Sequence, residues 1–147
     1  MNKPKFTWFI LEDIDGLYQY SAKRTHDMEG SYAPGDSIIV KIQLWNNRRG
    51  TEDVADAENA RLVLYFKNYE DNYLLKLFKI NFENETKPIT IDMDRGIFNL
   101  RTISGSANNG NELNVDNYLE FELQIGPIPS NVKSELKGLV LDVEYDS

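Results

Sequence analysis

Hydrophobic and polar residues alternate along several stretches of the chain, most clearly over residues 118–125. There the apolar side chains of Leu119, Phe121 and Leu123 alternate with the carboxylates of Glu120 and Glu122. Successive side chains of a β-strand point to opposite faces of the sheet, so this period of two predicts a strand with one buried face. Three other stretches show the same period, with inward rows at Ile38, Val40, Ile42 and Leu44, at Leu62, Leu64 and Phe66, and at Leu139, Leu141, Val143 and Tyr145.

Weaker apolar runs and the turns between them complete the expected fold. Further strands are predicted within residues 6–11, 17–21, 73–82, 89–91 and 97–103, although residues 74–80 also fit a bulge or a short helix. No helical pattern of about 10–15 residues lies between the strands, which disfavours a parallel sheet. The pattern therefore predicts an all-β fold, an antiparallel two-sheet β-sandwich of about eight or nine strands, either immunoglobulin-like or a jelly roll.

Length and charge narrow the classes of protein that remain. The chain has 147 residues, the usual size of one domain, so we expect a single β-sandwich domain over residues 1–147. Its net charge is −8, with 16 basic against 24 acidic residues, and this acidity argues against binding to nucleic acid. The apolar run at residues 6–11 is too short for a signal-peptide core or a membrane span, so we expect a soluble chain without membrane insertion.

Residues suited to catalysis are few. The chain has no cysteine, which excludes thiol catalysis, disulfides and zinc sites built on cysteine. Its single histidine, His26, precedes Asp27, but neighbours on an extended chain point to opposite faces and make a poor base and orienting pair. Glu120 and Glu122 have roughly the 7 Å spacing of a glycosidase carboxylate pair. The same alternation is typical of a solvated sheet face, so we expect no enzyme activity and no catalytic residues.

Acidic runs raise calcium as an alternative, although we expect no cofactor. Carboxylates spaced two apart before a glycine occur in calcium-binding loops. None of the runs in this chain continues with the further ligands that such loops contain, so solvated loop acids are the simpler interpretation. The metal ligands stay undetermined. The acids concerned lie within residues 13–16 and 92–96 and at Asp53, Asp56 and Glu58.

Aromatic and amide side chains are the candidates for ligand contact. Trp45 falls in the outward register of its strand and is followed by two asparagines. Aromatic rings can stack on a sugar while amides bond its hydroxyl groups. A tryptophan at the end of a strand also commonly covers the core of a sandwich, so both interpretations stay open. The candidate contact residues are Trp45, Asn46, Asn47, Tyr65 and Tyr118.

Residues 32–47 resemble the opening of bacterial immunoglobulin-like modules. They run Pro34-Gly35-Asp36, then an alternating strand, then asparagine at the end of that strand, as those modules do. Residues 136–143 resemble the last strand of such modules, whereas the long charged segment 48–59 departs from their pattern. The resemblance implies a cell-surface adhesion, spacer or assembly domain with no common catalytic residues.

These observations favour a non-enzymatic module that binds another protein or self-associates, on a bacterial surface or in a virus-like particle. Loops on a rigid scaffold usually carry the function of such folds, so the expected contact regions are residues 48–59 and 104–114. The alternative is a carbohydrate-binding β-sandwich with a glycan as its ligand, which requires two exposed coplanar aromatic rings, most plausibly Trp45 with a tyrosine. The sequence does not fix the compartment, and an extracellular or particle-associated location fits both functions.

Overall fold

The structure is a computed structural model, and it describes residues 2–14, 17–23, 30–31, 38–82, 85–88, 90–92, 94–111, 113–127, 135–136 and 139–145. The strands are β1 (Phe6–Ile14), β2 (Leu17–Lys23), β3 (Gly30–Ser31), β4 (Ile38–Asn46), β5 (Arg61–Phe66), β6 (Phe78–Phe82), β7 (Glu85–Pro88), β8 (Thr90–Asp92), β9 (Arg95–Asn99), β10 (Tyr118–Ile125), β11 (Glu135–Leu136) and β12 (Leu139–Glu144). The 3-10 helices are η1 (Tyr69–Leu77) and η2 (Val115–Asn117).

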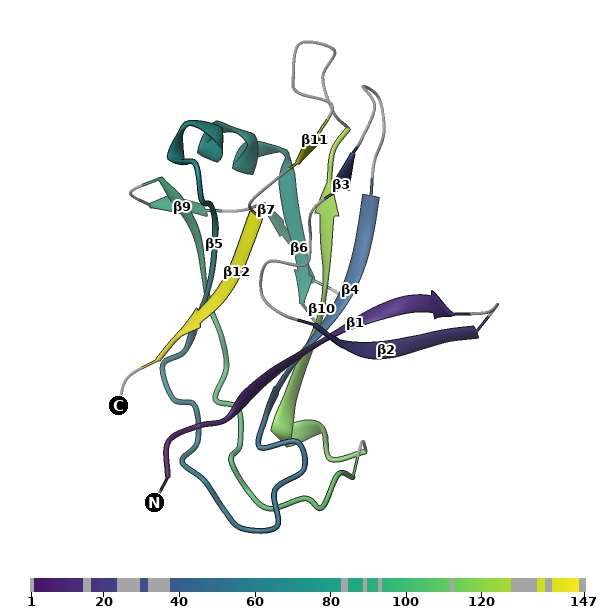
Figure 1. The fold of residues 1–147 in the computed structure, drawn as a ribbon. Helices are drawn as coiled ribbons and strands as arrows, with labels where there is room; N and C mark the ends of the chain where they lie inside the picture. Colours follow the sequence, from purple (N-terminus) through teal and green to yellow (C-terminus); the bar gives the residue numbers. More distant parts are fainter. Residues whose placement is uncertain are drawn as a thin grey trace.

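Antiparallel strands form two larger sheets that face each other across the core (Figure 1). The six-stranded sheet has the order β2-β1-β4-β10-β6-β7, and the four-stranded sheet has the order β12-β5-β9-β8. Strands β4 and β5 are consecutive in the chain but lie in different sheets. Strand β4 pairs with β10 and strand β5 pairs with β9, and β9 and β10 are also consecutive in the chain. This nested pairing builds the antiparallel β-sandwich that the sequence predicted.

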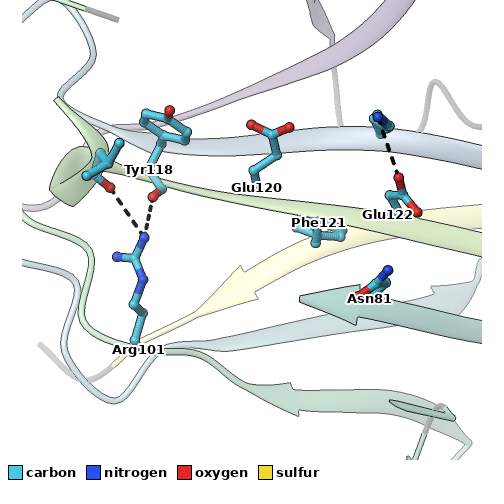
Figure 2. A pocket seen from close by; sticks show the side chains of 8 residues that line it. Asn81, Arg101, Tyr118, Glu120, Phe121 and Glu122 are labelled. Atoms are coloured by element: carbon cyan, nitrogen blue, oxygen red, sulfur yellow. Dashed lines mark hydrogen bonds and ion pairs between the residues drawn. The ribbon is translucent and has the colours of Figure 1, made fainter. Parts of the chain in front are cut away.

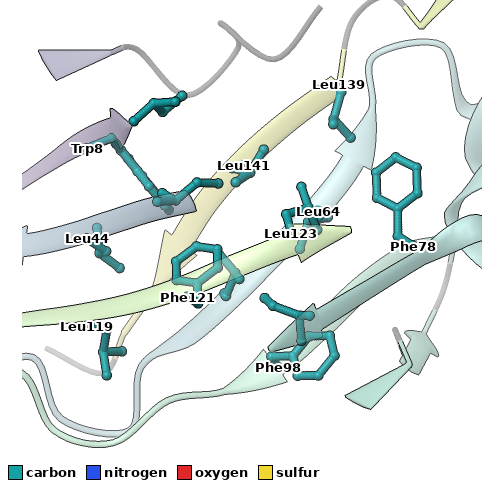
Figure 3. Close-up of a cluster of buried hydrophobic side chains, with 14 of the residues drawn as sticks. Trp8, Leu44, Leu64, Phe78, Phe98, Leu119, Phe121, Leu123, Leu139 and Leu141 are labelled. Atoms are coloured by element: carbon teal, nitrogen blue, oxygen red, sulfur yellow. The ribbon is translucent and has the colours of Figure 1, made fainter. Parts of the chain in front are cut away.

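The hydrophobic core lies between the two sheets (Figure 3). Leu119, Phe121 and Leu123 of β10 are buried, in one cluster with Leu62 and Leu64 of β5. Burying a side chain of this size contributes about 1.5–3 kcal/mol, so the inward rows hold the sheets together. The other predicted inward residues whose side chains are described also belong to this cluster or pack against it: Val40, Ile42, Leu44, Phe66, Leu139, Leu141, Val143 and Tyr145.

The strand predicted over residues 73–82 begins only at Phe78, because the preceding residues form η1. Leu74 and Leu75 are consecutive and both buried, which one face of a strand cannot achieve. The side chain of Asn68 accepts a hydrogen bond from Glu70 N at 3.2 Å and caps the helix. The short-helix alternative is therefore correct for residues 74–77. No helix within the described stretches is long and apolar enough to cross a membrane.

Candidate functional site

Two long connections lie side by side at one end of the sandwich, the lower end in Figure 1. Residues 47–60 link β4 to β5, and residues 100–117 link β9 to β10. Val54 N donates to Gly105 O at 2.8 Å, while Ala57 and Ile103 exchange two N–H···O bonds of 2.9 and 3.1 Å. We call these two connections the loop platform. They contain both regions predicted to contact a partner, residues 48–59 and 104–114.

Asn46 and Asn47 are buried, 0% and 4% exposed, and their amides bond within the protein. Asn46 Nδ2 donates to the carbonyl oxygens of Ala55 at 3.1 Å and Ile103 at 3.2 Å. Asn47 Nδ2 donates to Gly105 O at 2.8 Å. The sequence offered these two amides as ligand contacts, but in the structure both side chains are buried and bond to main-chain carbonyls of the protein. They join the loop platform to the end of β4.

Two asparagines that sequence reasoning missed complete this arrangement. Asn117 Nδ2 donates to Ser104 O at 2.9 Å and to Ser106 O at 3.0 Å, and Asn117 is fully buried. Asn108 Nδ2 donates to Asn47 O at 2.5 Å. We call Asn46, Asn47, Asn108 and Asn117 the asparagine cluster. A buried carbonyl without a donor costs about 1–3 kcal/mol, so the cluster fixes the main chain of both connections.

Two acids of residues 48–59, Asp53 and Asp56, also bond to the main chain of the platform. Asp53 Oδ1 accepts a bond from Ala107 N, and Asp56 Oδ1 accepts one from Gly105 N, both at 2.8 Å. Within the described stretches, no group of three or more acidic or histidine side chains is arranged to hold a metal ion. Asp15, Gly16 and the side chain of Asp92, which belong to the other acidic runs, lie outside the description, as do His26 and Asp27.

A groove runs along β10 on the outer face of the six-stranded sheet (Figure 2). Its volume is about 350 Å³. The Arg101 guanidinium closes the end near the platform, where Nη2 donates to Tyr118 O at 2.6 Å and to Val115 O at 3.3 Å. We call it the β10 groove, lined by Lys41, Asn81, Arg101, Tyr118, Glu120 and Glu122, together with Val115 and Phe121.

Both glutamates of the suspected glycosidase pair line the β10 groove, and each faces a neighbour on β4. Glu122 Oε1 lies 3.6 Å from Lys41 Nζ, and Glu120 Oε2 accepts a bond from Gln43 Nε2 at 3.2 Å. These are cross-strand neighbours in the register of β10 and β4, so sheet geometry accounts for both contacts. Among the described residues that line it, the groove carries equal numbers of basic and acidic side chains, which suits a polar ligand surface of mixed charge.

Trp45 is in the outward register, as the sequence indicated, yet only 1% of it is exposed. Tyr118, its partner on β10, stacks on the indole with ring centres 4.3 Å apart and an interplanar angle of 27°. The Arg48 guanidinium lies 5.4 Å from the indole ring, and Trp45 Nε1 donates to Gln43 Oε1 at 3.0 Å. Groups from β10 and from the platform cover the ring, so Trp45 is not one of the exposed rings that the carbohydrate alternative required.

The five candidate contact residues do not form one site. Tyr118 lines the β10 groove, whereas Tyr65 lies on β5 of the other sheet, opposite Val140 in the register. The Trp45 and Tyr118 rings lie roughly parallel and stack on each other, so they do not present the two exposed coplanar rings that the carbohydrate alternative required. Of the predicted contacts, Tyr118 alone borders the groove.

The platform instead presents two aliphatic side chains to solvent. Leu113 is 85% exposed and Val115 is 58% exposed. Leu113 N donates to Asn111 Oδ1 at 3.0 Å, and Val115 N donates to Leu113 O at 3.0 Å, so the main chain beneath both side chains is held. Sequence reasoning did not single out these two residues, because the run around them is polar, although Leu113 lies within the predicted contact region 104–114. The signal was present, since two aliphatic residues flank Asn114 in a loop with no strand period.

No protein-family model, curated protein or solved structure matches this chain.

Proposed function

We propose that this chain is a non-enzymatic protein-binding or assembly module, and that a partner binds across the loop platform and the β10 groove. The observation that carries this proposal is the exposure of Leu113 and Val115 on a platform whose main chain is braced by hydrogen bonds. Exposed apolar side chains that are grouped mark interaction sites more often than isolated ones do. A fixed main chain lowers the entropy lost on binding, which raises affinity.

The β10 groove supports the same proposal because it adjoins the exposed side chains. Val115 belongs to both, since it lines the groove and is largely exposed. Protein interfaces commonly have an apolar centre and a polar rim. Leu113 and Val115 would form the centre, and the mixed charges of Lys41, Arg101 and Glu120 would form the rim. The bacterial surface or virus-like particle that we propose as the setting rests on the resemblance of residues 32–47 to immunoglobulin-like modules.

Replacing Leu113 with serine is expected to lower the amount of partner recovered at least tenfold. An apolar anchor contributes roughly 1.4 kcal/mol or more of binding free energy, and its removal lowers the affinity by that factor. The immobilised chain would be incubated with an extract of its source organism and, separately, with a second copy of itself. Proteins retained by the wild-type chain and lost by Leu113→Ser would be identified by mass spectrometry. Because Leu113 is 85% exposed, the substitution should change stability by less than about 0.5 kcal/mol.

The matched control is Ile39→Ser, which removes an aliphatic side chain that is 61% exposed on β4 and lies outside the platform. The proposal expects Ile39→Ser to retain the partner at the wild-type level. A chain that stays monomeric and retains nothing, or one whose retained proteins are unaffected by Leu113→Ser, would contradict the proposal.

A further inference from the structure

We propose that Asn109 is a site of spontaneous covalent modification, at which the side-chain amide loses ammonia and residue 109 becomes aspartate or isoaspartate. Asparagine is a thermolabile residue type. It is followed directly by glycine once in the chain, at Asn109 and Gly110, in the part of the loop platform that precedes Leu113. The reaction consumes only water, so it does not depend on the proposed protein partner.

Residues 108–111 form a tight turn that exposes the Asn109 side chain. Asn111 N donates to Asn108 O at 2.9 Å, and the two central residues have positive φ angles of 52° and 79°. Turns with two positive φ angles favour asparagine followed by glycine. The Asn109 amide makes no hydrogen bond with the part of the chain that the structure describes, so no contact there holds it away from the main chain.

The modification begins with an intramolecular attack, since the Asn109 amide and Gly110 N are joined through residue 109. Gly110 N gives its proton to solvent and attacks Asn109 Cγ. A bond from Cγ to this nitrogen forms, the bond from Cγ to Nδ2 breaks, and Nδ2 leaves as ammonia with a proton taken from water. The product is a cyclic succinimide.

Water then opens the succinimide at one of its two carbonyl carbons. Cleavage of the bond to Cγ restores the main chain and leaves aspartate at position 109. Cleavage at the main-chain carbonyl carbon leaves isoaspartate, in which the chain continues through the former side chain. In both cases one water is consumed and one ammonia is released.

The surroundings of Gly110 permit this reaction in the folded protein. Glycine has no Cβ to shield its nitrogen, and a Cβ placed there would come no closer than 4.0 Å to its nearest described neighbour, Arg49 Cγ. Gly110 N donates to Asn108 Oδ1 at 2.9 Å, and this bond must open before the nitrogen can react. Local openings at exposed turns cost little free energy, so the folded chain can reach the reactive state.

The buried asparagines of the cluster provide an internal comparison. Asn47 is 4% exposed and Asn117 is fully buried. Their amides donate to Gly105 O at 2.8 Å and to Ser104 O at 2.9 Å. Neither is followed by glycine, and both would have to leave these bonds to react. We therefore expect both to stay intact while Asn109 converts.

Isoaspartate would alter the main chain that leads to Leu113, because it lengthens the turn by one carbon atom. Asn111 N closes this turn, and Asn111 Oδ1 accepts a bond from Leu113 N at 3.0 Å. Displacement of Asn111 would therefore release the main chain beneath Leu113. Slow conversion of Asn109 should weaken partner binding as the protein ages, a consequence that rests on the proposed function.

The test follows the folded chain by peptide mass spectrometry during incubation at mildly alkaline pH. Asn109 is expected to convert at least tenfold faster than Asn47 and Asn117, into two products of equal mass that chromatography separates. Asn109→Gln places the amide one carbon further from Gly110 N and should abolish conversion at this position. Gly110→Ala, which adds a methyl group beside the attacking nitrogen, should slow it several-fold.

The same chain unfolded in urea provides the reference for the reaction without structure. Asn109 that stays intact in the folded chain while it converts in urea would overturn the proposal, as would conversion of any other asparagine ahead of it. The separated isoaspartate form should show shifted amide resonances at Asn111 and Leu113, and unchanged resonances there would overturn the consequence for partner binding. Because mass spectrometry detects the products without a partner, failure of the partner experiment leaves this result intact.

Discussion

Replacing Asn47 with aspartate is expected to lower the free energy of unfolding by about 3 kcal/mol at neutral pH. The Asn47 amide group donates to the carbonyl oxygens of Glu52 at 2.9 Å and Gly105 at 2.8 Å. A carboxylate of the same shape has no N–H to offer, so those contacts become repulsive and the carbonyls lose their donor. Asn47 also has a φ of 57°, which asparagine and aspartate both tolerate, so the backbone contributes little to the loss.

The loss of stability in Asn47→Asp should increase as the pH rises. Burial and the facing carbonyl oxygens would raise the pKa of the introduced carboxyl in the folded state above its unfolded value of about 3.9. A group with a raised pKa in the folded state destabilises that state as the pH rises above the unfolded pKa. The difference in stability between Asn47→Asp and wild type should therefore be smallest below about pH 4 and increase toward neutral pH. Urea unfolding at several pH values measures it.

Asn109→Asp is the matched control for this substitution. Asn109 also has a positive φ, 52°, but its side chain is exposed. The same change of amide to carboxylate should cost less than about 0.5 kcal/mol there and show little dependence on pH. Equal losses at positions 47 and 109 would mean that the asparagine cluster does not brace the platform.

Replacing Gly105 with alanine should destabilise the protein by roughly 2–4 kcal/mol, through a steric clash. A Cβ atom at position 105 would lie against the main-chain carbonyl oxygens of Val54 and Ala55, within the distance at which real atoms do not approach each other. Both carbonyls belong to the facing connection, and Val54 N donates to Gly105 O. The two connections would have to separate to admit the methyl group. Thermal and urea unfolding would report the loss.

Gly110→Ala separates the steric cause from the conformational one. Gly110 has a φ of 79°, which alanine adopts poorly, but the nearest atom to a Cβ there is Arg49 Cγ at 4.0 Å. Only the conformational cost of about 1 kcal/mol applies. Gly105→Ala should therefore be the more damaging of the two. If Gly110→Ala lowers the stability as much as Gly105→Ala does, the close approach of the two connections at Gly105 is not the cause of the loss in Gly105→Ala.

The strands could be predicted because burial on one face imposes a period of two on the sequence. The alternation of Leu119, Phe121 and Leu123 with Glu120 and Glu122 is visible without any knowledge of the partners across the sandwich. The same reasoning placed Ile42 and Leu44 inward on β4, and the structure buries both. Local periodicity was sufficient here because any apolar side chain on the inward face of a strand is buried in the core.

The site could not be predicted in this way, because its contacts join residues far apart in the sequence. The outward register of Trp45 left a sugar contact and a role in covering the core both open, and the residue that stacks on its ring, Tyr118, lies 73 residues later. The amide of Asn47 was visible, whereas its partner Gly105, separated by 58 positions, was not. An asparagine offers the same donors to a ligand and to a buried carbonyl, so residue type alone did not decide between them.

The proposed function requires that the two connections form one braced platform that holds Leu113 and Val115 in place. Amide hydrogen exchange of the wild-type chain tests it most directly. We expect the amides of Val54, Ala57 and Ile103, which donate across the platform, to exchange within about tenfold of those of the central strand β4. Exchange at the rate of an unstructured chain at these three amides, with β4 still protected, would contradict it.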